Sequence, residues 1–101
     1  MSVINVNSEN FKEEVLGEGK VIVDFYADWC GPCKMMSPVI DKIAEEVNTA
    51  KVCKLNVDDA QEIAGEYGVM SIPTIIIFEN GDIKQKFVGV TSKQEIIEAI
   101  K

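Results

Sequence analysis

Two cysteines stand three positions apart in the segment Trp-Cys-Gly-Pro-Cys-Lys at residues 29–34. This spacing is compatible with half of a zinc site, with a structural disulfide or with a dithiol that opens and closes reversibly. A zinc site needs four ligands, whereas the chain supplies this pair, the distant Cys53 and no histidine. Carboxylates or a second copy of the chain would have to complete such a site, so we expect no metal.

Composition favours a catalytic or metal-binding role for the pair over a structural disulfide. The 101 residues include three cysteines, whereas small secreted disulfide scaffolds use more cysteines and in even number. The first residues carry no basic segment followed by an apolar one, which predicts no signal peptide. No apolar run approaches the roughly 20 residues of a membrane span, and a net charge of −7 argues against nucleic-acid binding. We therefore expect a cytoplasmic protein without a membrane or nucleic-acid partner.

Strands and helices alternate along the chain. Alternating or continuous apolar residues predict strands at 2–6, 21–27, 50–57, 74–78 and 83–90. Helical spacing predicts helices after Ser8, over 33–47, after Asp58 or Asp59, and after Ser92. The order β-α-β-α-β-α-β-β-α implies parallel crossovers with an antiparallel hairpin at one edge. We predict an α/β fold with a central mixed five-stranded sheet flanked by four helices, in one domain over residues 1–101.

Several residues predict where these elements end. Ser8 and either Asp58 or Asp59 suit N-caps, and Ser92 with Glu95 forms a capping-box pattern. Gly68 predicts the C-terminal end of the third helix. Asn80-Gly81 predicts the hairpin turn, and Pro38 predicts a kink in the long helix.

The predicted elements place the cysteine pair at a helix N-terminus. Cys30 follows a strand and Cys33 lies in the first turn of the next helix. This places the sulfur of Cys30 at the helix N-terminus, where free N–H groups and the helix dipole favour a thiolate. Pro32 fits the first turn without losing a hydrogen bond, and Gly31 permits a close approach. A Cys-x-x-Cys between a strand and a helix favours a reversible dithiol.

Three segments resemble the thioredoxin family: Phe-Tyr-Ala-Asp-Trp-Cys-Gly-Pro-Cys-Lys-Met-Met-Ser-Pro at 25–38, Ser-Ile-Pro-Thr at 71–74 and Val-Gly-Val at 88–90. The resemblance implies the thioredoxin fold and a general protein-disulfide reductase that needs no bound cofactor. It also implies recharging by a thioredoxin reductase, and clients such as ribonucleotide reductase, peroxiredoxin or methionine sulfoxide reductase. Oxidases and isomerases of this fold carry a histidine between the cysteines, so Gly-Pro disfavours that activity. The alternative is a thioredoxin-fold scaffold subunit without redox turnover.

The resemblance also implies roles for individual residues. Cys30 would attack the client disulfide and Cys33 would resolve the mixed disulfide, in keeping with a more exposed first sulfur and a better hidden second one. Trp29 would cover the site, although a lone tryptophan is usually a core residue. Pro73 would follow a cis peptide bond, although X-Pro bonds are usually trans. Ile72 would offer backbone groups to an extended client segment.

The remaining positions have structural alternatives. Gly89 opens the client groove in the family, although it could be an ordinary strand glycine. Asp24 lies in a strand that we expect to be buried on both faces, which would raise its pKa, and Lys54 on the neighbouring strand would limit that rise. The resemblance makes Asp24 the proton acceptor for Cys33. We expect Cys53 to be a buried core residue, and Tyr26 stands where the family often has tryptophan.

Overall fold

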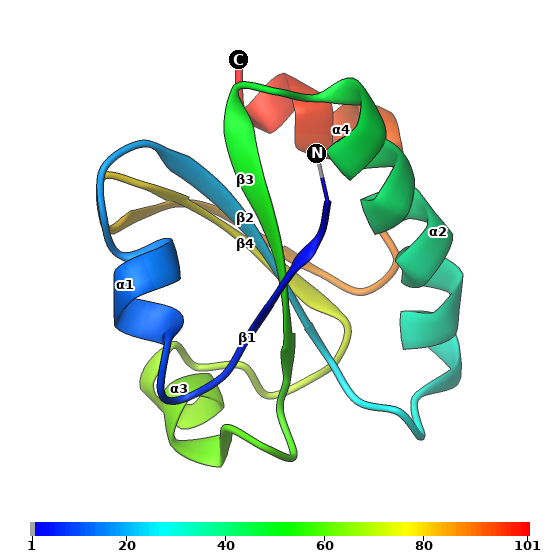
Figure 1. Ribbon diagram of the computed structural model, residues 1–101. Coiled ribbons are helices and arrows are strands. Elements are labelled where there is room, and N and C mark those ends of the chain that lie inside the picture. The colour runs from blue at the N-terminus through cyan, green and yellow to red at the C-terminus, as the bar shows by residue number, and fades with distance from the viewer. Residues whose placement is uncertain (1) are drawn as a thin grey trace.

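Within residues 2–101, which the computed structural model describes, five strands form one sheet between four helices (Figure 1). In chain order the elements are β1 (Ile4–Val6), α1 (Phe11–Val15), β2 (Lys20–Tyr26), α2 (Gly31–Glu46), β3 (Ala50–Asn56), α3 (Gln61–Glu66), β4 (Thr74–Glu79), β5 (Asp82–Val88) and α4 (Lys93–Ala99). The predicted order of elements is confirmed. No helix in this range is both long enough and apolar enough to cross a membrane.

The sheet is mixed, with the strand order β1-β3-β2-β4-β5. β3 pairs in parallel with both β1 and β2, and β4 pairs antiparallel with β2 and β5. The hairpin between β4 and β5 turns at Asn80 and Gly81, whose φ angles are 52° and 86°. Positive φ at both central residues is the geometry for which the Asn-Gly pair is favoured.

Two apolar cores cover the two faces of β2. Val21, Val23 and Phe25 belong to one core, which Phe11 and Val15 of α1 and Ile63 of α3 help to build. The alternate residue Ile22 belongs to the other core, together with residues of α2 and α4: Met36, Ile40, Ile43 and Ile96. Figure 1 shows α1 and α3 on one side of the sheet and α2 and α4 on the other. The strand is therefore buried on both faces, as the apolar run predicted.

Two of the predicted helix caps are wrong. The N-cap of α1 is Asn10, without a side-chain cap bond, and the Ser8 hydroxyl donates to the carboxylate of Glu62 on α3. The N-cap of α3 is Ala60, so neither Asp58 nor Asp59 caps that helix. The Ser8 and Asp58 side chains bond to partners other than the free N–H groups of the following helix, Ser8 to Glu62 and Asp58 to the Trp29 indole.

The ends of the other helices and strands lie at or within two residues of the predicted positions. Gly68 has a φ of 65° and ends α3, and the N–H of Val69 closes the helix by donating to the carbonyl of Ala64 at 2.8 Å. The capping box at Ser92 and Glu95 is present in both directions. The long helix begins at Gly31, two residues earlier than predicted, and continues through Pro38. β5 ends at Val88, before the end predicted at residue 90.

The capping box gives a direct test of these assignments. Ser92→Ala removes the acceptor for the Glu95 N–H and should lower the free energy of unfolding by about 1 kcal/mol in a urea titration. Ser8→Ala is the matched control, because that serine is exposed and caps no helix. It should change the stability by less than about 0.5 kcal/mol. Equal losses in the two variants would contradict the assignment of the caps.

Candidate functional site

The sheet topology brings three distant segments together at one end of β2. Because β4 runs antiparallel to β2, its first residue Thr74 pairs with Phe25, near the end of β2. Thr74 also pairs with Val88, the last residue of β5. The loop after β2, the loop before β4 and the loop after β5 therefore meet. These are the three segments that the sequence singled out.

The two cysteines lie where β2 leads into α2. Cys30 is the N-cap of α2, and its Sγ accepts a hydrogen bond of 3.2 Å from the backbone N–H of Cys33. The Cα atoms of the two residues are 5.2 Å apart, and the sulfur atoms are joined in a disulfide. Pro32 occupies the first turn, where its missing N–H removes no helical bond. A thiolate formed at Cys30 would accept this same N–H and gain from the helix dipole.

As whole residues the two cysteines are buried to the same extent. Their exposed fractions are 5% for Cys30 and 4% for Cys33, because both pack with Ala27, and Ile72 covers them from the loop before β4. At Gly31, a Cβ would meet no atom of residues 2–101 within 4 Å, apart from its chain neighbours and the backbone of its own helix. Any close approach that Gly31 permits is therefore to another molecule.

The loop before β4 lies against the dithiol. The Ile72–Pro73 peptide bond is cis, as the resemblance implied, and the carbonyl oxygen of Ile72 is 3.7 Å from Cys30 Sγ. The N–H of Gly89 donates to the carbonyl of Pro73 at 2.8 Å, which fixes the loop after β5 to the same place. Gly89 has a φ of 91°, a conformation that favours glycine, and the space beside it is open.

Trp29 lies on the surface beside the dithiol, and 70% of it is exposed. Its indole N–H donates to the carboxylate of Asp58 at 2.8 Å. The structural alternative of a core tryptophan is therefore wrong. Asp58 therefore contacts a residue of the site and is not the helix cap that its local sequence predicted. The sequence did not reveal this contact because the two residues are 29 positions apart.

Asp24 is fully buried in β2, and neither of its oxygens has a hydrogen-bond partner among residues 2–101. Burial raises its pKa from 3.8 to about 7, and the positive charge of Lys54 limits the rise. The two residues are paired in the register of β2 and β3. Asp24 alternates with Val23 and Phe25 along the strand, so it faces the α2 side of the sheet, where Cys33 lies.

The third cysteine is separate from this site. Cys53 on β3 is fully buried in the core beneath α1 and α3, on the opposite face of the sheet. Burial raises the pKa of its thiol to about 11, so it remains protonated at neutral pH. This confirms the prediction of a buried core residue.

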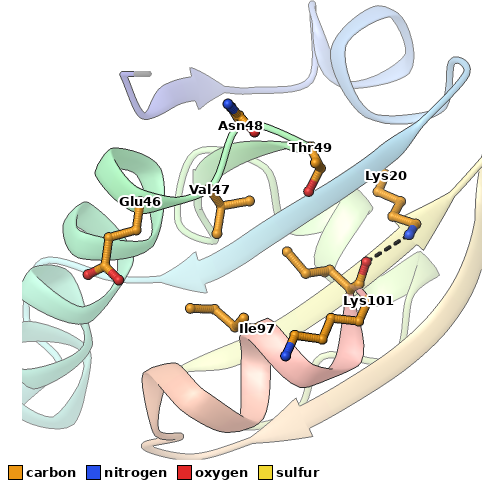
Figure 2. A pocket seen from close by; sticks show the side chains of 8 residues that line it. Lys20, Glu46, Val47, Asn48, Thr49, Ile97 and Lys101 are labelled. Atoms are coloured by element: carbon orange, nitrogen blue, oxygen red, sulfur yellow. Dashed lines mark hydrogen bonds between the residues drawn. The ribbon is translucent and has the colours of Figure 1, made fainter.

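A hollow of about 400 Å³ lies at the other end of the molecule (Figure 2). It lies between the end of α2 and the end of α4, and there Lys20 Nζ donates to the carbonyl of Ile100 at 2.7 Å. The 16 residues of α2 separate it from the dithiol by about 24 Å. No cysteine is among the residues that line it. Within residues 2–101, no cluster of three or more histidine, cysteine or acidic side chains could hold a metal ion.

Comparisons with known proteins agree with this geometry. The family model described as Thioredoxin matches residues 2–101. The chain is 46% identical over 98 residues to a thioredoxin of Rickettsia felis, covering 95% of this chain and 93% of that protein. It is 43% identical over 96 residues to a thioredoxin of Pseudomonas aeruginosa, covering 93% and 89%.

The solved structure of a mutant thioredoxin from Halobacterium salinarum superposes with a TM-score of 0.90 at 34% identity, covering 98% of this chain and 88% of that one. The sheet and helices are thus those of the thioredoxin fold, and the dithiol at the start of α2 supplies the family's redox group. The chain belongs to the thioredoxin family and is a protein-disulfide reductase, recharged by a thioredoxin reductase.

Proposed function

We propose that Cys30 is the attacking nucleophile and that Cys33 resolves the mixed disulfide. The observation that carries this order is the hydrogen bond from the Cys33 N–H to Cys30 Sγ at the start of α2. The thiolate of Cys30 attacks one sulfur of the client disulfide and releases the other as a thiolate. The thiolate of Cys33 then attacks Cys30 Sγ, releases the second client sulfur and closes the Cys30–Cys33 disulfide. Two electrons pass to the client in this exchange.

We assign the proton from Cys33 to Asp24. The carboxylate faces the α2 side of the sheet, and a pKa of about 7 lies close to the operating pH at which a base transfers protons most effectively. Neither oxygen is engaged by another group of the described chain, which leaves both free to accept the proton. Lys54 supports this role because its positive charge favours the ionised form.

The client surface in this proposal surrounds Cys30. Trp29, Ile72 and Gly89 are the client-binding residues, and Gly31 leaves room for the client next to the sulfur. In this proposal the backbone of Ile72, whose carbonyl oxygen is 3.7 Å from Cys30 Sγ, pairs with an extended client segment. Three further apolar residues are exposed, in the loop before β4, at the end of β5 and in the loop after β5: Met70, Val88 and Val90. An extended client would cover them.

The partners that we propose follow from the family. Thioredoxin reductase supplies the electrons, and ribonucleotide reductase, peroxiredoxin and methionine sulfoxide reductase are the candidate clients. We place this activity in the cytoplasm. The match of the family model to residues 2–101 supports one thioredoxin domain over the whole chain.

Trapping of a client tests the order of attack. In a Cys53→Ala background, Cys33→Ser should accumulate a mixed disulfide between Cys30 and insulin, which a non-reducing gel and mass spectrometry would detect. Cys30→Ser should trap almost none, since Cys33 lacks the position at the helix N-terminus. Cys53→Ala alone should reduce insulin at nearly the parent rate, because that thiol is buried on the other face of the sheet.

Equal trapping by the two variants would contradict the assignment of Cys30 as nucleophile. A parent protein that does not accelerate insulin reduction by dithiothreitol would instead favour the scaffold alternative. The two outcomes differ, because the first concerns the order of the thiols and the second the presence of any turnover.

Asp24→Ala tests the buried carboxyl through stability. The folded pKa of about 7 exceeds the unfolded value of 3.8, so the parent binds the proton more tightly when folded. The parent should therefore lose stability as pH rises from about 4 to about 7, by at most about 4 kcal/mol. Asp24→Ala lacks this loss and should be the more stable protein above neutral pH, as measured by urea midpoints across pH.

The same substitution should slow resolution of the mixed disulfide by about 10- to 100-fold at neutral pH, because the proton acceptor is missing. Asp24→Asn is the matched control, since it keeps the side-chain volume without the charge, and it should show the same flat pH dependence. If Asp24→Ala differs from the parent by a constant amount at every pH, or resolves as fast as the parent, the proposed role of Asp24 is wrong.

A further inference from the structure

The ammonium of Lys54 has two unusual neighbours. Its Nζ lies 3.4 Å from the hydroxyl oxygen of Ser37 on α2 and 4.5 Å from the centre of the Tyr26 ring. None of the ion pairs in the described part of the chain includes Lys54. The charge is thus held by a hydroxyl and an aromatic face, without a carboxylate in contact.

This arrangement lies beside the resolving thiol. A cavity of about 130 Å³ is lined by Tyr26, Ala27, Asp28, Cys33, Lys34, Ser37 and Lys54. Ser37 lies one helical turn after Cys33 on α2, so the two side chains share one face of that helix. The hydroxyl that holds the ammonium and the sulfur that must lose a proton therefore line the same small space.

The pKa of Asp24 depends on the position of the Lys54 ammonium. Lys54 is its register neighbour on β3, and its positive charge is the one that lowers the pKa of the buried carboxyl. On the other side, the register neighbour on β4 is the apolar Ile75, and α4 contributes the apolar Ile96 to this face. The remaining ionisable groups around the cavity are the side chains of Tyr26, Asp28, Cys33 and Lys34.

We propose that Ser37 and Tyr26 are positioning residues that hold the Lys54 ammonium at this cavity, where its charge acts on Asp24. The inference rests on the proposed role of Asp24 as proton acceptor. A free lysine side chain gains rotamer entropy and hydration by moving into water. A hydroxyl acceptor and a cation–π contact oppose that movement. Without them the ammonium moves outward and its effect on Asp24 weakens.

Ser37→Ala tests the hydroxyl. The carboxyl carbon of Asp24, followed by NMR in the oxidised protein, should titrate at higher pH than in the parent, because less positive charge favours the ionised form. Resolution of the mixed disulfide should slow by about two- to three-fold at neutral pH and match the parent at alkaline pH, where Asp24 is ionised in both proteins. Ser37→Thr keeps the hydroxyl and should restore the parent titration.

Tyr26 has its own matched pair of variants. Tyr26→Phe keeps the aromatic face and should leave the titration of Asp24 close to that of the parent, whereas Tyr26→Leu should move it to higher pH. Lys54→Met removes the charge and should therefore give the largest shift of the Asp24 titration among these variants. Adding Ser37→Ala to Lys54→Met should then produce no further shift, because the hydroxyl acts through the lysine.

Two results would overturn the inference: an Asp24 titration in Ser37→Ala that superimposes on the parent, or an equal shift from Ser37→Ala with and without Lys54. Both are read in the oxidised protein and need no turnover. If Cys33→Ser still traps insulin while Ser37→Ala leaves the titration unchanged, the positioning role fails and the order of attack stands. If trapping fails, it is the proposed function that is wrong.

Discussion

The burial of β2 on both faces is the constraint on which the site depends. Helices on each side remove the strand from water, and the two apolar cores that result hold the sheet and α2 in a fixed relation. Since β2 leads through a short loop into α2, the same packing fixes the first turn of α2, where Cys30 receives its hydrogen bond. It also withdraws Asp24 from solvent, which is why that carboxyl holds its proton up to nearly neutral pH. Thiolate stabilisation and proton affinity thus share one structural cause.

The antiparallel insertion of β4 supplies the rest of the site. A parallel neighbour of β2 would begin at the opposite end of the sheet, far from the dithiol. Because β4 is antiparallel, the residues before it lie where β2 ends, which brings Ile72 to Cys30. β5 returns to the same end, and the bond from the Gly89 N–H to the carbonyl of Pro73 joins the two loops. The client surface that we propose is therefore a consequence of strand direction.

The sequence predicts most of what is determined by neighbours in the chain. The capping box at Ser92, the hairpin at Asn80 and the position of the cysteines depend on residues within about four positions, and all three are confirmed. The errors concern side chains with distant partners: Ser8 with Glu62, and Asp58 with the Trp29 indole. Equal burial of the two cysteines was missed for the same reason, since Ile72 covers them from a segment about 40 residues away. The sheet topology creates such contacts, and a local sequence pattern does not encode them.

An unpartnered carboxyl in a central strand opposes folding at neutral pH, and residues 2–101 offer no hydrogen bond that would relieve it. Such a bond would also lower the pKa of Asp24 and make it a weaker base in the role that we propose for it. A direct ion pair with Lys54 would have the same effect. Holding the ammonium on Ser37 and the Tyr26 ring gives an intermediate case, in which the charge acts on the carboxyl from outside contact distance. The loss of stability and the proton affinity that the proposed role of Asp24 requires are therefore two results of one burial, and a change that removes the first also removes the second.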